Sequence, residues 1–141
     1  MLCASAHILA KPQPIPALAR FEAIALAKVD ALPEAFRRLA RAVAINVVDW
    51  PEPWMLRDVG LSEPLELTGM YDGIPLTEKS FFDQPLAPDA VWLFREPILA
   101  EWHERGGISL EELVAHVTVH EFAHHFGWSD EDIATIDRWW E

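Results

Sequence analysis

The sequence predicts an α+β protein, and three observations support this prediction. Apolar residues recur at helical spacing near both ends of the chain, most clearly in the residues before Gly127. Between them lie short alternating or continuous apolar runs, such as residues 43–47 and 91–94, which are typical of strands. Of the 141 residues, 51 % are hydrophobic and 24 % are charged, which is enough apolar material for the core of one domain.

The N-terminal segment is expected to be a tail. It contains three prolines at alternate positions, which favour an extended conformation: Pro12, Pro14 and Pro16. We therefore expect residues 1–16 to form a Pro-rich tail and residues 17–141 to form a single domain.

Helices and strands are expected to follow in turn. Residues 17–30 are strong helix formers, and a proline at position 33 suits the first turn of a second helix over residues 33–42. The alternation over residues 43–50 predicts a strand. Residues 54–64 are expected to form a loop or a short helical turn. Residues 65–71 alternate again, which predicts a second strand.

The next elements are shorter. Residues 76–89 are expected to be mostly loop, and the apolar run 91–94 predicts a buried strand. Pro97 begins a short helix that is expected to end near Arg105, because two glycines follow it.

The best-defined helix begins after Ser109. The Ser109 hydroxyl and the Glu112 carboxylate are spaced as a capping box, in which each satisfies a backbone N–H of the first helical turn. The helix is expected to end at Gly127, whose missing Cβ permits a left-handed cap. Ser129 can cap a final helix.

This helix carries the motif HEFAH at residues 120–124. At about 100° and 1.5 Å per residue, His120 and His124 lie about 40° apart around the helix and about 6 Å apart along it. Both imidazoles can therefore reach one cation, and Glu121 lies beside them as a general base would. The histidines are expected to continue the apolar stripe of Leu113 and Val117 and so to face the core.

A third ligand follows at the spacing HExxHxxGxxD. Gly127 can reverse the chain so that Asp130 turns back toward the histidines, although Asp130 also suits the start of a helix. His120, His124 and Asp130 therefore predict a site for one Zn²⁺ per chain with an open fourth position, and Glu121 is the predicted catalytic residue. Other divalent metals could use the same ligands.

Neighbouring residues leave alternatives open. His116 is expected to be a core histidine or to support the ligands, because a pairing of His116 with His120 would have Val117 in place of the glutamate. His125 points away from the ligand side and is expected to be packed or solvated. Tyr71 fits either a donor to an oxyanion or the inward end of a strand.

The charge balance favours some partners over others. There are 11 Lys and Arg residues against 23 Asp and Glu residues, a net charge of −12. This charge argues against nucleic acid and anionic lipid surfaces as partners, and it suits a basic peptide or a cation better. No apolar stretch reaches the roughly 18 residues of a membrane helix. No secretory signal is visible, so a cytoplasmic location is expected.

Three segments resemble the small bacterial zincin-like metallopeptidases, a family once catalogued as a domain of unknown function. They are VTVHEFAHHFGWSDEDI at residues 117–133, GMYDGIPLTEKS at residues 69–80 and VWLFREPIL at residues 91–99. The resemblance runs from about Phe21 to Trp140, and it includes all four predicted site residues. It implies a minimal zincin-like fold, in which a small mixed β-sheet packs on the HExxH active-site helix.

The resemblance also implies a zinc metallopeptidase that hydrolyses bonds in a peptide or protein substrate. In zincins an edge strand binds substrate as an added antiparallel strand, and either residues 65–71 or residues 91–94 could be that edge. One alternative is a zinc-stabilised binding or regulatory module with little turnover. Structural zinc sites, however, usually have four protein ligands and favour cysteine. The other alternative is a plain α+β domain whose histidines merely pack.

Overall fold

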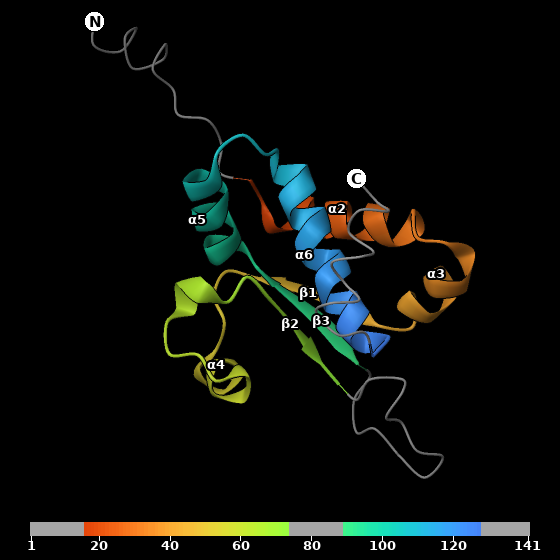
Figure 1. Cartoon of the computed structure of the whole chain (residues 1–141), viewed down its shortest axis with the longest axis horizontal. Coiled ribbons are helices and arrows are strands. Elements are labelled where there is room, and N and C mark those ends of the chain that lie inside the picture. The colour runs from red at the N-terminus through yellow and green to blue at the C-terminus, as the bar shows by residue number, and fades with distance from the viewer. Residues whose placement is uncertain (1–15, 74–88, 128–141) are drawn as a thin grey trace, which may run out of the picture.

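The structure is a computed structural model that describes residues 16–73 and 89–127. Its elements in these ranges are α2 (Leu18–Asp30), α3 (Glu34–Ala40), β1 (Ala44–Val48), α4 (Pro53–Val59), the 3-10 helix η1 (Pro64–Glu66), β2 (Gly69–Asp72), β3 (Ala90–Phe94), α5 (Arg95–Arg105) and α6 (Leu110–His125). These helices and one small sheet confirm the α+β class (Figure 1). Within the described ranges, no helix is long and apolar enough to cross a membrane.

The sheet is mixed, as the resemblance implies. Its order is β1-β3-β2, with β3 parallel to β1 and antiparallel to β2. Of the two segments considered as a substrate-binding edge, residues 91–94 therefore lie in the central strand. Of these two segments, only the one that contains β2 reaches an edge of the sheet formed by the described residues, and β1 forms the opposite edge.

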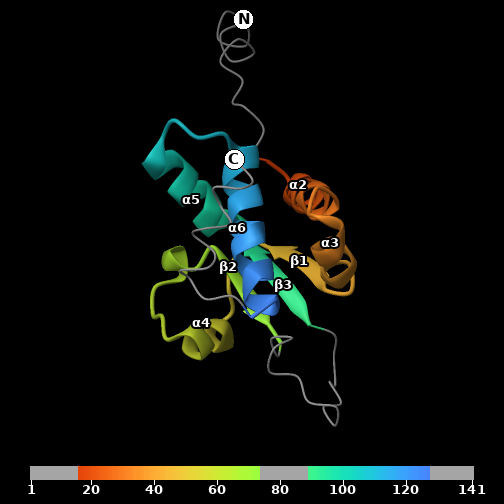
Figure 2. The same cartoon turned by 45° about the vertical axis from the view of Figure 1, so that its right-hand side comes forward.

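Helices cover both faces of this sheet. Val91 and Leu93 of β3 point to the larger core, which contains residues of α2, α5 and α6. Phe94 and the partly buried Trp92 point to the opposite face, where Met55 of α4 packs. This alternation is the ordinary period of a strand that is buried on both faces. On the larger-core side, α6 lies over the sheet with α2 and α5 to either side of it (Figure 2).

Two expected elements differ from the structure. Residues 54–64, expected to form a loop or a short helical turn, begin with the helix α4, which is longer than one turn and ends at Gly60 in the left-handed conformation with φ of 76°. The expected strand at residues 65–71 begins only at Gly69. Its first residues form η1 instead, because Pro64 suits a helical first turn and Glu63 accepts a hydrogen bond from the Leu65 N–H at 3.4 Å.

The ends of α6 lie where the sequence predicts them. The Ser109 hydroxyl accepts a hydrogen bond from the Glu112 N–H at 3.0 Å, which caps the first turn. Gly127 follows the helix with φ of 80°, a conformation that favours glycine. The expected N-terminal tail up to residue 15, most of the expected loop at 76–89 and the expected helix after Ser129 lie outside the described residues.

Candidate metal centre

The close approach of α6 to β2 positions the HExxH motif. A Cβ atom added to Gly69 would lie 2.8 Å from Cγ1 of Val117, 3.1 Å from Cγ of Glu121 and 3.2 Å from the backbone oxygen of Trp92. Only a residue without a side chain allows this distance between helix and strand. The first residue of the edge strand therefore lies directly against the glutamate of the motif.

This contact leads to a stability prediction. Gly69→Ala is expected to lower the free energy of unfolding by about 1–3 kcal/mol, because its methyl group must displace Val117 or Glu121. Urea unfolding monitored by tryptophan fluorescence measures the change. In a Val117→Ala background the nearest atom is absent, so the same substitution is expected to cost less. An equal loss in both backgrounds would rule out this contact as the cause.

His120 and His124 lie on successive turns of α6, on the same side of the helix. Their ring centroids are 5.0 Å apart and their planes meet at 77°. Both side chains are half-buried, whereas Glu121 between them is only 9 % exposed. The described part of the motif thus places two imidazoles close to each other, with a buried carboxylate on the adjoining face.

The expectation that both histidines face the core is only partly met. If Leu113 is set at 0°, the buried residues of α6 include Leu110 at about 60°, Val114 at about 100° and Thr118 at about 140°. Most of the buried residues lie between 0° and 180°, so their centre is near 90°, close to Glu121, while Val119 and Ala123 are buried on the other side of the helix. The two histidines, at about −20° and 20°, lie near the Leu113 end of this range, whereas β2 meets the helix at Val117 and Glu121.

The third predicted ligand, Asp130, lies outside the described residues. Among residues 16–73 and 89–127, no group of three or more His, Cys, Asp or Glu side chains could hold a metal ion. The donors that are described fit zinc chemistry, since His120 and His124 supply two nitrogen ligands of the type that Zn²⁺ prefers. The left-handed Gly127 ends the helix three residues before Asp130, as the prediction requires.

A buried polar cluster joins the last turn of α6 to the sheet. The Tyr71 hydroxyl donates a hydrogen bond to Oδ2 of Asp89 at 2.8 Å and lies 3.1 Å from Nδ1 of His125. Nδ1 of His125 is 3.3 Å from the same Asp89 oxygen, and the side chains of His125 and Asp89 are 5 % and 8 % exposed. Burial and the hydrogen bond to Asp89 raise the pKa of Tyr71 far above its ordinary value.

This cluster resolves two alternatives from the sequence. His125 is packed and not solvated. The Tyr71 hydroxyl is hydrogen-bonded to Asp89, which favours the inward strand position over an oxyanion donor. The sequence interpretation did not single out Asp89, because no spacing rule links the residue before a strand to a helix 36 positions later.

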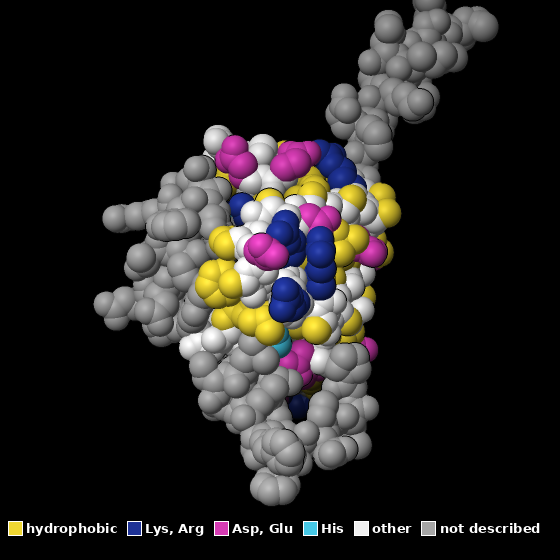
Figure 3. Space-filling view, turned by 90° about the vertical axis from the view of Figure 1, so that its right-hand side faces the viewer, with side chains coloured by type: hydrophobic (Ala, Val, Ile, Leu, Met, Phe, Trp, Pro, Cys, Tyr) yellow, Lys and Arg dark blue, Asp and Glu magenta, His cyan; other side chains and the backbone are white. Residues whose placement is uncertain are grey.

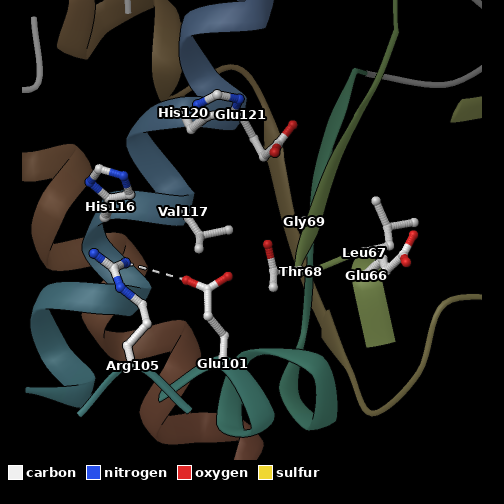
Figure 4. A pocket seen from close by; sticks show the side chains of 10 residues that line it. All are labelled: Glu66, Leu67, Thr68, Gly69, Glu101, Arg105, His116, Val117, His120 and Glu121. Carbon is white, nitrogen blue, oxygen red and sulfur yellow. Dashed lines mark hydrogen bonds and ion pairs between the residues drawn. The ribbon is translucent and has the colours of Figure 1, made fainter. Parts of the chain in front are cut away.

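A pocket of about 330 Å³ adjoins the motif (Figure 4). His120 and Glu121 line one end of it, and His116 lines it one turn earlier. His116 is exposed to solvent, so the expectation of a core histidine is wrong, and its alternative role of supporting the ligands stays a prediction.

Comparison with known proteins agrees with this geometry. A family model described as zincin-like metallopeptidase matches residues 40–140, which is more than half of the chain. The matched range contains the whole sheet, α6 and the position of Asp130. No curated protein matches the chain.

Proposed function

Because the chain belongs to the zincin-like metallopeptidase family, we propose that it is a zinc-dependent peptidase with one metal ion per chain. His120, His124 and Asp130 would bind the ion, and Glu121 would be the general base. The proposal depends chiefly on the half-buried imidazoles of His120 and His124, whose ring centroids are 5.0 Å apart, beside the buried carboxylate of Glu121. Residues 17–141 would form the single domain that carries this site.

The chemistry divides between the ion and the chain. Zn²⁺ held by these ligands would polarise the scissile carbonyl and lower the pKa of a water at its open position to about 7. Glu121 would accept a proton from the attacking water and then deliver it to the nitrogen of the leaving amine. Packing against Gly69 restricts the Glu121 side chain, so the carboxylate is held on the side of the edge strand.

The strand β2 supplies a surface for the peptide backbone. One side of β2 pairs with β3, and its other side has no strand partner among the described residues. Backbone groups on that side could pair with an extended peptide as an additional antiparallel strand. The peptide would then lie next to Gly69 and Glu121, where the proposed reaction takes place.

Metal removal tests this proposal. The purified protein is expected to contain about one zinc per chain by elemental analysis. It should cleave members of a broad peptide library, lose that activity with a chelator and recover it with Zn²⁺. Asp130→Ala is expected to lose the zinc, whereas the neighbouring Asp132→Ala should keep it. A stably bound zinc without any cleavage would favour a metal-stabilised binding module.

A further inference from the structure

The pocket beside Glu121 lies between three elements. Its walls come from α6, from the C-terminal half of α5 and from the residues that lead from η1 into β2 (Figure 4). Leu67 and Val117 are buried and make part of the wall apolar, and Gly69 adds no side chain there. A volume of about 330 Å³ is enough for one long side chain.

The polar part of the pocket is mainly acidic. Glu66 stands on the η1 side and Glu101 on the α5 side, and both are accessible to solvent (Figure 4). Among the described residues that line the pocket, Arg105 is the one with a permanent positive charge. Its Nη1 lies 3.3 Å from Oε2 of Glu101, so this charge is already compensated. The charge of Glu101 is compensated in the same pair, so Glu66 and Glu121 leave the lining net negative, and Glu66 is the carboxylate farther from the proposed zinc ligands.

Among the described residues, most of the positive charge lies away from this pocket. Figure 3 views the molecule from the side of α3, where Lys and Arg side chains gather. The segment from α2 to the residue that follows α3 carries five of them: Arg20, Lys28, Arg37, Arg38 and Arg41. This face lies beyond the β1 edge of the sheet, on the side away from β2 (Figure 1). The acidic pocket therefore lies on the less basic side of a chain with a net charge of −12.

We propose that this pocket binds a lysine or arginine side chain of the substrate, next to the bond that is cleaved. The proposal rests on the peptidase function proposed above. A long basic side chain has an aliphatic stem that can lie along Leu67 and Val117 and a cationic end that can reach Glu66 and Glu101. An acidic side chain would meet an excess of carboxylates, and an apolar one would gain nothing from them.

The direction of the peptide places this basic residue. A segment paired antiparallel with β2 runs opposite to the order Gly69–Asp72, so its more C-terminal residues lie beside Gly69. The pocket opens at Gly69 and the residues just before it. The basic side chain is therefore expected in the C-terminal part of the bound segment.

Peptides that differ in charge at one position test the proposal. In a set of fluorogenic peptides, one position at a time is varied between Lys, Arg, Leu and Glu. The other positions carry the same mixture of residues in every member of the set. Cleavage by the zinc-loaded protein is measured for each member. Binding to zinc-loaded Glu121→Gln protein is measured by fluorescence anisotropy. The wild-type chain is expected to favour Lys and Arg over Glu at one position in both assays.

Substitutions that remove a charge from exposed pocket residues are expected to change the preference for Lys over Glu in opposite directions. Glu66→Gln is expected to lower the Lys-to-Glu preference about threefold, and Arg105→Gln to raise it about threefold, as is typical of exposed ion pairs. Glu104→Gln should change nothing, since Glu104 is exposed on α5 and does not line the pocket. A merely structural effect of these substitutions would not reverse its sign.

The outcomes separate the two proposals. Cleavage without a basic preference, or a preference that Glu66→Gln and Arg105→Gln leave unchanged, would overturn the pocket assignment and leave the peptidase function intact. A basic preference in binding without any cleavage would support the pocket and contradict the peptidase function. Absence of both binding and cleavage would contradict both proposals.

Discussion

Replacing Glu121 by glutamine is expected to lower kcat/KM for peptide hydrolysis by at least about a hundredfold, the lower end of what a general acid–base group contributes. The amide of glutamine cannot accept the proton of the attacking water. It keeps the size of the side chain, so the contact with Gly69 is preserved. Kinetic assays of the zinc-loaded variant measure the loss, and elemental analysis should find its zinc content unchanged.

A matched substitution on the same helix separates chemistry from folding. Glu112 is exposed on the first turn of α6, and glutamine is also accepted at this position of a capping box. Glu112→Gln is therefore expected to keep both zinc and activity. Full activity in Glu121→Gln would remove this residue from the proposed mechanism, and loss of zinc in that variant would assign it a ligand role instead.

The second large effect is expected at Asp89. Asp89→Ala removes the acceptor of the Tyr71 hydroxyl and the partner of His125, which is 4 % exposed. The Tyr71 hydroxyl and Nδ1 of His125 can still pair with each other, so the loss corresponds to about one unsatisfied buried polar group, and the free energy of unfolding is expected to fall by about 1–3 kcal/mol. Denaturant unfolding measures this loss. Asp58→Ala, at an exposed position of α4, should have little effect.

Alkaline titration gives an independent check of this cluster. Tyr71 is the only tyrosine of the chain, so phenolate absorbance reports on it alone. Its pKa is raised in the folded protein, first by burial and then by Asp89. Since an unfolded tyrosine ionises near pH 10, the stability of the wild-type protein should fall as the pH rises above about 10. Asp89→Ala should show phenolate at lower pH while still folded. Identical titration curves would show that Asp89 contributes nothing to the shift.

Local patterns in the chain predicted much of this fold. The capping residue Ser109, the glycine at position 127 and the helical spacing between them predicted the bounds of α6, and the structure confirms them. The same spacing predicted that His120 and His124 lie on one side of that helix. These features depend on residues within a few positions of each other, where helix geometry and capping act. Asp130 as third ligand remains a prediction from spacing.

Local patterns were less successful where proline and neighbouring polar groups compete. The alternation at residues 65–71 suggested a longer strand, but Pro64 and the Glu63 carboxylate favour η1 over its first residues. Alternation of apolar and polar residues indicates which side chains could share one face of a strand. This pattern does not indicate whether the backbone hydrogen bonds are made to a neighbouring strand or within a turn.

Taken alone, the order of residues predicted the α+β class, a capped helix and the HExxHxxGxxD motif with its spacing, because each of these follows from nearby positions. Only the tertiary structure shows which side of α6 meets β2 and that Gly69 contacts Glu121. It alone shows the cluster of Tyr71, Asp89 and His125. The pocket between α5, α6 and the segment before β2 is likewise visible only in the tertiary structure. The physical reason is that these contacts join residues far apart in sequence, whose meeting depends on the packing of the helices on the sheet.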